Sequence, residues 1–339
     1  MSLPTVGLSF ERDREGDDVP ALGGVREAVD DLFLGLLNDV HERILARPDD
    51  AANVAAALDD VILALRSRWQ SSTAEEWDAF VALCRQHPLI ELLHRDPFTH
   101  RAFAKPRGYA GDAELIDYIY GVEEQWTPPG ADPLGQKIFE YTIHSPATEG
   151  VRARRAFVAG RIDRLAERRK KPQVLSIAAG HLREVNLSAA ARRKRLGRLV
   201  ALDADPISLA EVERTYGHLG VETVPANIRS LLAGKVQLGQ FDLIYSLGLF
   251  DYLQAPVARR LVSNLFEMLR PGGQLIVANF LPGVRDVGYM EIFMDWRLIY
   301  RTRQDMVDLT AEIEEPAIRE VRLFAEENHN IVFLELTRD

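Results

Sequence analysis

The chain has 339 residues, of which 47% are hydrophobic, and it carries 51 acidic and 41 basic residues for a formal net charge of −10. The length allows roughly two domains of an ordinary globular protein. The acidic balance argues against a nucleic-acid partner, because neutralising phosphates requires a basic surface. No segment approaches the roughly 20 apolar residues of a membrane span, and the single cysteine, Cys84, excludes an internal disulfide framework. We therefore expect a cytoplasmic protein without a membrane span.

The first part of the chain reads as helical. Residues 1–20 are highly charged, and we expect them to be disordered. Apolar residues at helical spacing predict helices over 25–48 and 51–69, and Thr73 followed by Glu76 is a capping box for a helix through Cys84. Further short helices are expected over 88–94, 97–104, 113–120, 134–144 and 148–169. Residues 21–146 are thus expected to form an all-helical domain, which a helix joins to a second domain over 147–339.

The segment KPRGYAGDAELIDYIYG, residues 105–121, stands out within the helical part. Glycines flank Tyr109 and Ala110, and Asp112 is placed to cap the following helix. A glycine-rich turn with an exposed tyrosine suits a lid over a ligand. An inter-helix turn with Tyr109 packed in a crevice explains the pattern equally well.

Residues 173–205 predict one βαβ unit. An apolar run over 174–178 ends in the small residues Ala178, Ala179 and Gly180, a helix is expected from near His181, and a second apolar run ends at Asp203. The small turn lets backbone N–H groups approach a ligand, and the helix would add its positive N-terminal end. A carboxylate at the end of the neighbouring strand can accept both hydrogen bonds of a ribose diol. The unit therefore suggests an adenosine-containing ligand.

The absence of two sequence motifs limits the choice among adenosine-containing ligands. The chain has neither the G-x-G-x-x-G cradle of dinucleotides nor the G-x-x-x-x-G-K-[ST] loop of triphosphates. S-adenosylmethionine (SAM) needs no phosphate cradle, only room beside the turn and an acceptor for its diol. We therefore expect SAM as the cofactor.

Residues from about 171 to 339 resemble the Rossmann-like class of SAM-dependent methyltransferases. The likeness lies in SIAAGHL, ALDAD, VPANIRSLL, FDLIYSLGLFDYL and LRPGGQLIVANF. It implies an α/β fold with a seven-stranded, mostly parallel sheet after the helical domain. The cofactor residues that the motifs and the likeness indicate are Ala178, Ala179, Gly180, Arg183, Asp203, Ala204, Asn227, Ile228, Ser246 and Leu247. The turn departs from the family, because Ala178 and Leu182 stand where glycines are common and Ser176 where an acid is common.

A narrower resemblance rests on PRGYAGDAELIDYIY, SIAAGHLRE and DWRLIYRT. Together these blocks look like the bacterial family of extracellular-factor methyl ester biosynthesis proteins. That likeness implies methylation of the carboxylate of a 3-hydroxy fatty acid or a related small natural product, which needs no catalytic base because the carboxylate is already ionised. The acceptor would instead need a cationic clamp.

Candidate acceptor residues come from three places. In a helix, Arg297 and Arg301 of DWRLIYRT would share one face beside Tyr300 and could clamp a carboxylate. His144 is the candidate base for a hydroxyl or amine acceptor. The aromatic residues available to face the sulfonium are Tyr109, Tyr141, Phe250 and Tyr252. Each of these residues also has a purely structural interpretation.

Other functions remain open at this stage. One is a SAM-consuming cyclase that forms a small ring amino acid of the azetidine carboxylate type and releases methylthioadenosine. Another is a non-catalytic SAM-binding interaction module. No spacing requires a metal, a homodimer is left open, and the basic clusters at 152–155, 164–171 and 192–198 are interpreted as solvated charge on helices.

Overall fold

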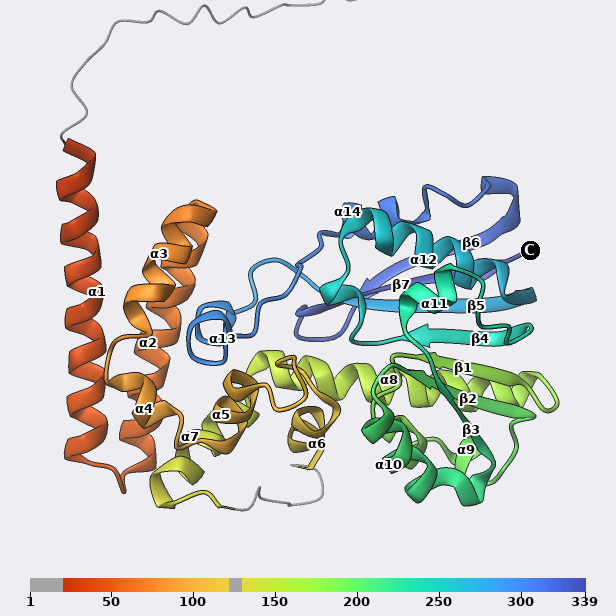
Figure 1. The fold of residues 1–339 in the computed structure, drawn as a ribbon, viewed down its shortest axis with the longest axis horizontal. Helices are drawn as coiled ribbons and strands as arrows, with labels where there is room; N and C mark the ends of the chain where they lie inside the picture. The colour runs from red at the N-terminus through yellow and green to blue at the C-terminus, as the bar shows by residue number, and fades with distance from the viewer. Residues whose placement is uncertain (1–20, 122–129) are drawn as a thin grey trace, which may run out of the picture.

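A computed structural model of the chain describes residues 21–121 and 130–339, with the side chains of the first helix from Val29 onward. The expected disorder of residues 1–20 lies outside the described residues. An N-terminal helical region precedes a seven-stranded sheet that carries helices on both faces (Figure 1). The predicted α/β architecture is therefore confirmed.

The helices before the sheet follow the predicted segments closely. They are α1 (Ala21–Ala46), α2 (Ala51–Ser71), α3 (Ala74–Cys84), α4 (Leu89–Leu93), α5 (Pro97–Ala104), α6 (Ala113–Gly121), α7 (Pro133–Ile143) and α8 (Pro146–Arg168). The capping box of α3 is present, with Thr73 Oγ1 accepting from the Glu76 N–H at 3.3 Å and Glu76 Oε2 accepting from the Thr73 N–H at 2.9 Å. Among the described helices, none is long and apolar enough to cross a membrane.

The strands are β1 (Gln173–Ile177), β2 (Arg198–Asp203), β3 (Val221–Pro225), β4 (Phe241–Ser246), β5 (Leu269–Phe280), β6 (Ile318–Ala325) and β7 (Ile331–Arg338). Their order in the sheet is β3-β2-β1-β4-β5-β7-β6. Strands β1 to β5 pair in parallel, and β7 runs antiparallel to both of its neighbours. The strand order reverses beside β1, which is where open α/β sheets place their ligands.

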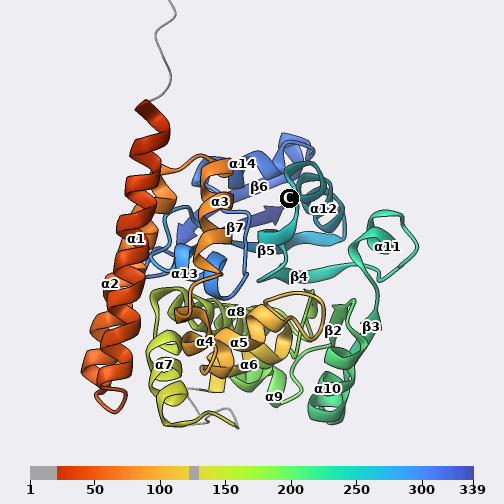
Figure 2. The same ribbon diagram turned by 60° about the vertical axis from the view of Figure 1, so that its left-hand side comes forward.

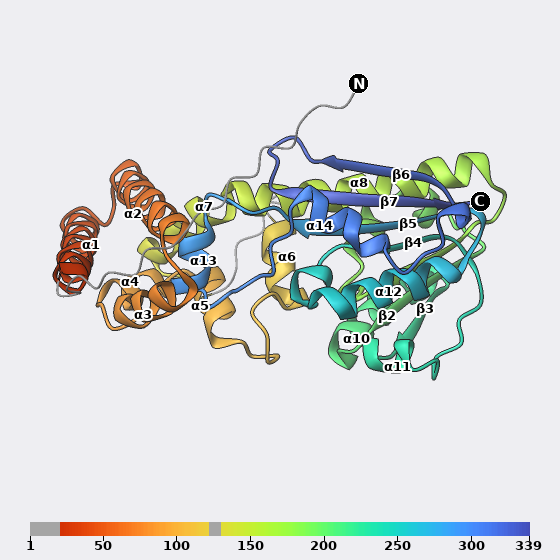
Figure 3. The ribbon, with the colours of Figure 1, turned by 90° about the horizontal axis from the view of Figure 1, so that it is seen from above.

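Two layers of helices bury the sheet (Figure 3). The remaining helices are α9 (Ala189–Arg192), α10 (Pro206–Tyr216), α11 (Ile228–Leu232), α12 (Ala255–Glu267), α13 (Val287–Phe293) and α14 (Arg303–Val307). Alternate side chains of each strand point to opposite faces, so that Val174 joins the apolar cluster under α8 and α10. Leu175 joins the second cluster, under α11 and α12. Burial on both faces explains why these strands read as continuous apolar runs.

Helix α13 leaves the sheet after β5 and packs against α2 and α3 of the helical region (Figure 2). Gly288 permits this approach, because a Cβ atom there would lie 2.5 Å from the Cβ of Leu65. Trp77 Nε1 donates to Glu291 Oε2 at 2.8 Å in the same contact. The helical region is therefore held against the sheet by α13, which lies between the strands β5 and β6 in the sequence.

Candidate active site

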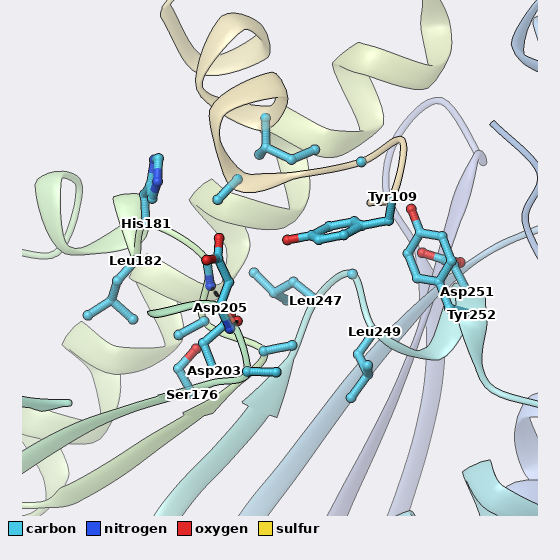
Figure 4. A pocket seen from close by; sticks show the side chains of 18 of the residues that line it. Tyr109, Ser176, His181, Leu182, Asp203, Asp205, Leu247, Leu249, Asp251 and Tyr252 are labelled. Atoms are coloured by element: carbon cyan, nitrogen blue, oxygen red, sulfur yellow. Dashed lines mark hydrogen bonds between the residues drawn. The ribbon is translucent and has the colours of Figure 1, made fainter. Parts of the chain in front are cut away.

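A cavity of about 440 Å³ opens at the carboxyl ends of β1, β2 and β4 (Figure 4). Its floor comes from the loops that follow these strands. Part of its wall comes from the α5–α6 loop and α6, through Tyr109, Gly111, Ala113 and Ile116. The volume is within the range of about 300–1,000 Å³ that is typical of small-molecule sites.

The turn after β1 is tighter than the sequence suggests. Ala178, Gly180 and Leu182 have φ values of 52°, 53° and 54°, so two residues that are not glycine adopt the left-handed region. The prediction of a helix from near His181 is wrong, because the left-handed conformation of Leu182 prevents a continuous helix there. A short 3₁₀ turn, Arg183–Asn186, follows instead, and α9 begins only at Ala189. The turn after β1 therefore does not lead directly into a long helix.

Asp203 ends β2 with its carboxylate beside this turn. Its Oδ2 accepts from the Gly180 N–H at 2.8 Å, and its Oδ1 accepts from the Asp205 N–H at 2.8 Å. The side chain therefore holds both loops of the floor while it lines the cavity (Figure 4). Each carboxylate oxygen has two lone pairs, so both oxygens keep capacity for a ligand's hydroxyl groups.

Most of the residues expected around an adenine line the cavity, but one of them lies in the protein core. Ala179, Ala204, Asn227, Ile228 and Leu247 line the cavity. The Asn227 side chain also caps α11 by accepting from the Ser230 N–H at 2.9 Å. Ser246 is fully buried and donates to the Ile177 carbonyl at 3.0 Å, so it joins β4 to β1 from outside the cavity.

Two charged contacts hold segment 105–121 over the floor. Asp117 of α6 accepts from Arg183 through both oxygens, at 2.9 and 2.6 Å, and its Oδ2 lies 2.8 Å from His181 Nδ1. At the other end, Arg107 donates to Asp205 Oδ2 at 2.8 Å. Burial tends to raise the pKa of Asp117, but Arg183 and His181 outweigh it and leave the pKa below its usual value. Arg183 thus lines the cavity while its guanidinium is bound to Asp117.

Tyr109 and Gly111 lie above the floor. The Tyr109 ring extends over the cavity from the α5–α6 loop (Figure 4), and burial together with Asp203 raises its pKa to about 12. Gly111 contacts the opposite wall, because a Cβ atom there would lie 2.6 Å from the Tyr252 hydroxyl and 2.8 Å from the Trp296 ring. Trp296 Nε1 in turn donates to Tyr252 Oη at 2.7 Å.

Arg154 and Asp251 place a buried pair of opposite charges in the wall. The two side chains are 7% and 3% exposed, and Arg154 Nη1 lies 4.0 Å from Asp251 Oδ2. Asp251 Oδ1 accepts from the Phe280 N–H at 2.8 Å. Burial raises the pKa of Asp251 to about 6, although Arg154 lowers it in part. The expectation that the 152–155 cluster is solvated is therefore wrong for Arg154, and it is wrong for the buried Arg155 as well.

A second buried acid, Glu184, lines the cavity behind the turn. The Tyr245 hydroxyl donates to its Oε1 at 2.5 Å. Burial raises the pKa of Glu184. Burial, together with the nearby Glu184 carboxylate, also raises the pKa of Tyr245 well above its usual value. Glu184 therefore has a hydrogen-bond partner within the protein, in addition to lining the cavity.

Tyr141 and His144 lie away from this cavity. The Tyr141 hydroxyl contacts Asp59 and Arg285. His144 is exposed, with Nδ1 2.6 Å from the Glu140 carbonyl at the end of α7. Neither side chain lines the cavity. Tyr141 lies on α7 beside the segment that follows β5, and His144 is the C-cap of α7.

DWRLIYRT is not helical, so the expectation that Arg297 and Arg301 share a helical face is wrong. The Ile299 N–H donates to the Asp251 carbonyl at 2.7 Å and the Arg301 N–H to the Phe280 carbonyl at 3.0 Å, and these bonds hold the segment extended beside the sheet. Arg297 pairs with Asp78 at 2.5 Å.

The other residues expected to bind an acceptor also serve the fold. Arg301 is buried and donates to the Phe250 carbonyl at 2.5 Å. The Phe250 ring is fully buried in the cluster under α12. Tyr300 packs edge-on against Trp69, with ring centroids 5.8 Å apart. Of the residues expected to bind an acceptor or to face the sulfonium, Tyr109 and Tyr252 line the cavity.

Several cavity residues have little or no local signal in the sequence. Arg154 sits in a basic run of α8, Trp296 in an aromatic segment, and Asp117 on a short helix; only the fold brings them together. Asp251 is noticeable as an acid just after β4, where ligands bind. Within the described residues, no group of three His, Cys, Asp or Glu side chains is arranged to hold a metal.

Comparison with known proteins identifies the domain. Residues 174–273, under half of the chain, match the family model described as "Methyltransferase domain". A Bordetella parapertussis structure described as a possible exported protein shares 17% identity at a TM-score of 0.56, over 94% of this chain and 99% of that one, which shows a common fold. No protein of curated function matches the sequence.

Two methyltransferase structures are more distantly similar. Magnesium protoporphyrin IX methyltransferase from Synechocystis, with bound SAH, shares 12% identity at a TM-score of 0.45, over 67% of this chain and all of that one. The N-methyltransferase NodS from Bradyrhizobium japonicum, with S-adenosyl-L-homocysteine, shares 14% identity at a TM-score of 0.41, over 65% of this chain and 98% of that one. The match of residues 174–273 to the family model shows that the chain carries a methyltransferase domain, and the cofactor of such a domain is SAM.

Proposed function

We propose that the protein transfers the methyl group of SAM to the carboxylate of a small acceptor, a fatty acid or a related natural product. The observation that carries the proposal is Arg154, which lines the cavity although it is only 6% exposed. Asp251, the acid paired with it, is 4.0 Å away and beyond hydrogen-bonding distance. A guanidinium in this setting complements an incoming carboxylate. The likeness to methyl ester biosynthesis proteins points to the same acceptor.

The floor of the cavity suits the cofactor. Ala178, Ala179 and Gly180 keep side chains out of the turn, and the Asp203 carboxylate has lone pairs for a ribose diol. Ile228 and Leu247 supply apolar walls for an adenine. When bound, SAM supplies a methyl group on a positively charged sulfur, which makes that methyl electrophilic.

The chain's own residues would then bind, orient and exclude water. A carboxylate acceptor is ionised at neutral pH, so no residue has to remove a proton from it. Arg154 would hold the carboxylate, and Tyr252 and Trp296 would bound it on the far side. Segment 105–121 would act as a lid that keeps water out. With a cavity of about 440 Å³ for both molecules, only the reacting end of a long acceptor is enclosed.

One observation favours a second candidate, methyl transfer to a hydroxyl group. Asp251 lines the cavity as a buried carboxyl with its pKa raised to about 6. Such a group can accept a proton from an acceptor hydroxyl near neutral pH. The two candidates therefore require different forms of Asp251: methyl transfer to a carboxylate is favoured by the protonated form, and methyl transfer to a hydroxyl group requires the ionised form.

The pH dependence of turnover is expected to separate them. With decanoic acid as acceptor, kcat/KM should fall as pH rises through about 6, because ionised Asp251 repels the acceptor carboxylate and competes for Arg154. With decanol, kcat/KM should rise over the same range, because only ionised Asp251 takes up a proton. The other groups that face Asp251 are Arg154, Arg301 and Tyr252. Arginine and tyrosine side chains ordinarily titrate far above pH 6.

Asp251→Asn is the matched control for this profile. Asparagine keeps an oxygen for the Phe280 N–H but does not titrate. The transition near pH 6 should disappear in this variant with either acceptor. If it persists, a group other than Asp251 governs the profile.

The overall reaction is tested with methyl-labelled SAM and linear carboxylic acids, alcohols and amines. Label in a methyl ester, with release of S-adenosylhomocysteine that depends on the acid, is the expected result. Formation of methylthioadenosine from SAM alone would contradict the proposal and indicate the SAM-consuming cyclase instead. Saturable SAM binding without turnover on any of these acceptors would favour the non-catalytic module.

A further inference from the structure

An exposed basic face lies at the amino end of the sheet, away from the cavity. It is defined here as the exposed basic side chains of segments 164–171 and 192–195, eight in all. Arg169 is left out of this definition because it pairs with Asp242 at 2.5 Å. Such a concentration is unexpected in a chain with a formal net charge of −10.

The two segments are neighbours in space. Arg195 Nη2 donates to the Ala166 carbonyl at 3.0 Å, and the Gly197 N–H donates to the Pro172 carbonyl at 2.9 Å. Gly197 packs so closely on Lys171 that a Cβ atom there would lie 2.4 Å from the Lys171 carbonyl oxygen. The basic side chains therefore form one continuous surface.

Their charge is not compensated locally. Within the described part of the chain, none of the eight side chains has an ion pair with a carboxylate. Asp163 of α8 accepts from Ser188 Oγ at 2.6 Å and from the Ala190 N–H at 2.8 Å, and it interacts with Arg192 through charge attraction without a direct ion pair. Glu167 is the single acid within the two segments. Burial lowers the pKa of the neighbouring Arg161, and the guanidiniums of Arg164 and Arg168 lower it further.

The basic face and the cavity are at opposite ends of the strands β1 and β2. The face directly precedes β1 and β2, and the cavity follows them, so strands of five and six residues separate the two. At about 3.3 Å per residue this is roughly 15–20 Å, beyond a Debye length of about 8–10 Å. The α1–α2 pair, with eight acidic and four basic residues over 29–71, is at the far end of the molecule (Figure 1).

We propose that the basic face docks on an anionic phospholipid surface. Within the described residues none of these Lys and Arg side chains pairs with a carboxylate, although Arg195 donates to the Ala166 carbonyl. Segments 164–171 and 192–195 contain no aromatic residue. Single-stranded nucleic acids are usually held by aromatic stacking, and specific protein interfaces by apolar or aromatic anchors. A charged membrane needs neither, because several basic side chains within a Debye length of it suffice. Docking in this way leaves the cavity free and turns the acidic α1–α2 pair away from the membrane.

Co-sedimentation of the full chain with vesicles tests the proposal. Vesicles in which a quarter of the lipid is phosphatidylglycerol should bind the protein at about 0.05 M KCl and release it at about 0.5 M. Vesicles of phosphatidylcholine alone should bind little. A triple variant, Arg192→Gln, Arg193→Gln and Lys194→Gln, should bind the anionic vesicles roughly 100-fold more weakly.

A matched triple variant elsewhere on the surface controls for total charge. Lys235→Gln, Arg260→Gln and Arg303→Gln remove three exposed charges outside the basic face, and vesicle binding should stay within about twofold of the unmodified chain. Equal loss in both variants, equal binding to neutral vesicles, or no binding at low salt would each overturn the proposal. Release by duplex DNA at matched phosphate would assign the face to nucleic acid instead. SAM binding should be unchanged in both variants, so this test is independent of the reaction.

Discussion

Replacing Asp203 with alanine is expected to weaken SAM binding by roughly 10- to 150-fold, about 1.5–3 kcal/mol, the range for losing hydrogen bonds to a charged group. The structure gives this carboxylate two tasks. It is placed for a ribose diol, and it accepts from the Gly180 and Asp205 N–H groups, which shape the floor. Calorimetric titration of SAM into the purified variant measures the change.

Two further variants separate the tasks of Asp203. Asparagine keeps the shape and one acceptor oxygen, so Asp203→Asn should lose less affinity than the alanine variant. Glu213→Gln removes an exposed charge from nearby α10 and should leave the affinity unchanged. Unaltered binding by Asp203→Ala would mean that other groups hold the ribose.

Local signals explain which features could be predicted from the sequence. The strands β1 and β2, the small turn after β1 and Asp203 all lie within about 30 consecutive residues, where apolar runs and small residues indicate backbone geometry directly. The same holds for the caps: Thr73 and Glu76 bond as predicted, and Asp112 accepts from the Leu115 N–H at 2.8 Å. Each depends on contacts that span only a few residues.

Long-range contacts explain what could not be predicted. DWRLIYRT has a plausible helical pattern, but backbone bonds to Asp251 and Phe280 hold it extended, and its arginines meet partners from distant elements. Tyr141 is held in the same way, by Asp59 and Arg285. Arg154 shows the opposite case, because a basic run on a helix reads as solvated while the fold places one of its arginines in a cavity. Partners brought by tertiary packing leave no periodic trace in the sequence.

Arg154→Gln is expected to raise KM for decanoic acid by roughly 10- to 150-fold, because the variant lacks the charge that would hold the acceptor carboxylate. The Kd of SAM should change by less than about twofold. Arg154→Lys keeps the charge without the two-pronged guanidinium, so its KM should lie in between. Steady-state kinetics with either substrate varied, together with calorimetry of SAM, give the three values.

The pH profile adds a readout that a loss of folding would not mimic. Arg154 lowers the pKa of Asp251, so its removal should move the transition near pH 6 to higher pH. Arg164→Gln removes an exposed charge from the same helix and should shift neither KM nor the profile. A rise in the Kd of SAM with an unchanged KM for the acid would instead assign Arg154 to the carboxylate of the cofactor. The acceptor end of the cavity would then contain Asp251 without a cation, and methyl transfer to a hydroxyl group would become the better account of the site.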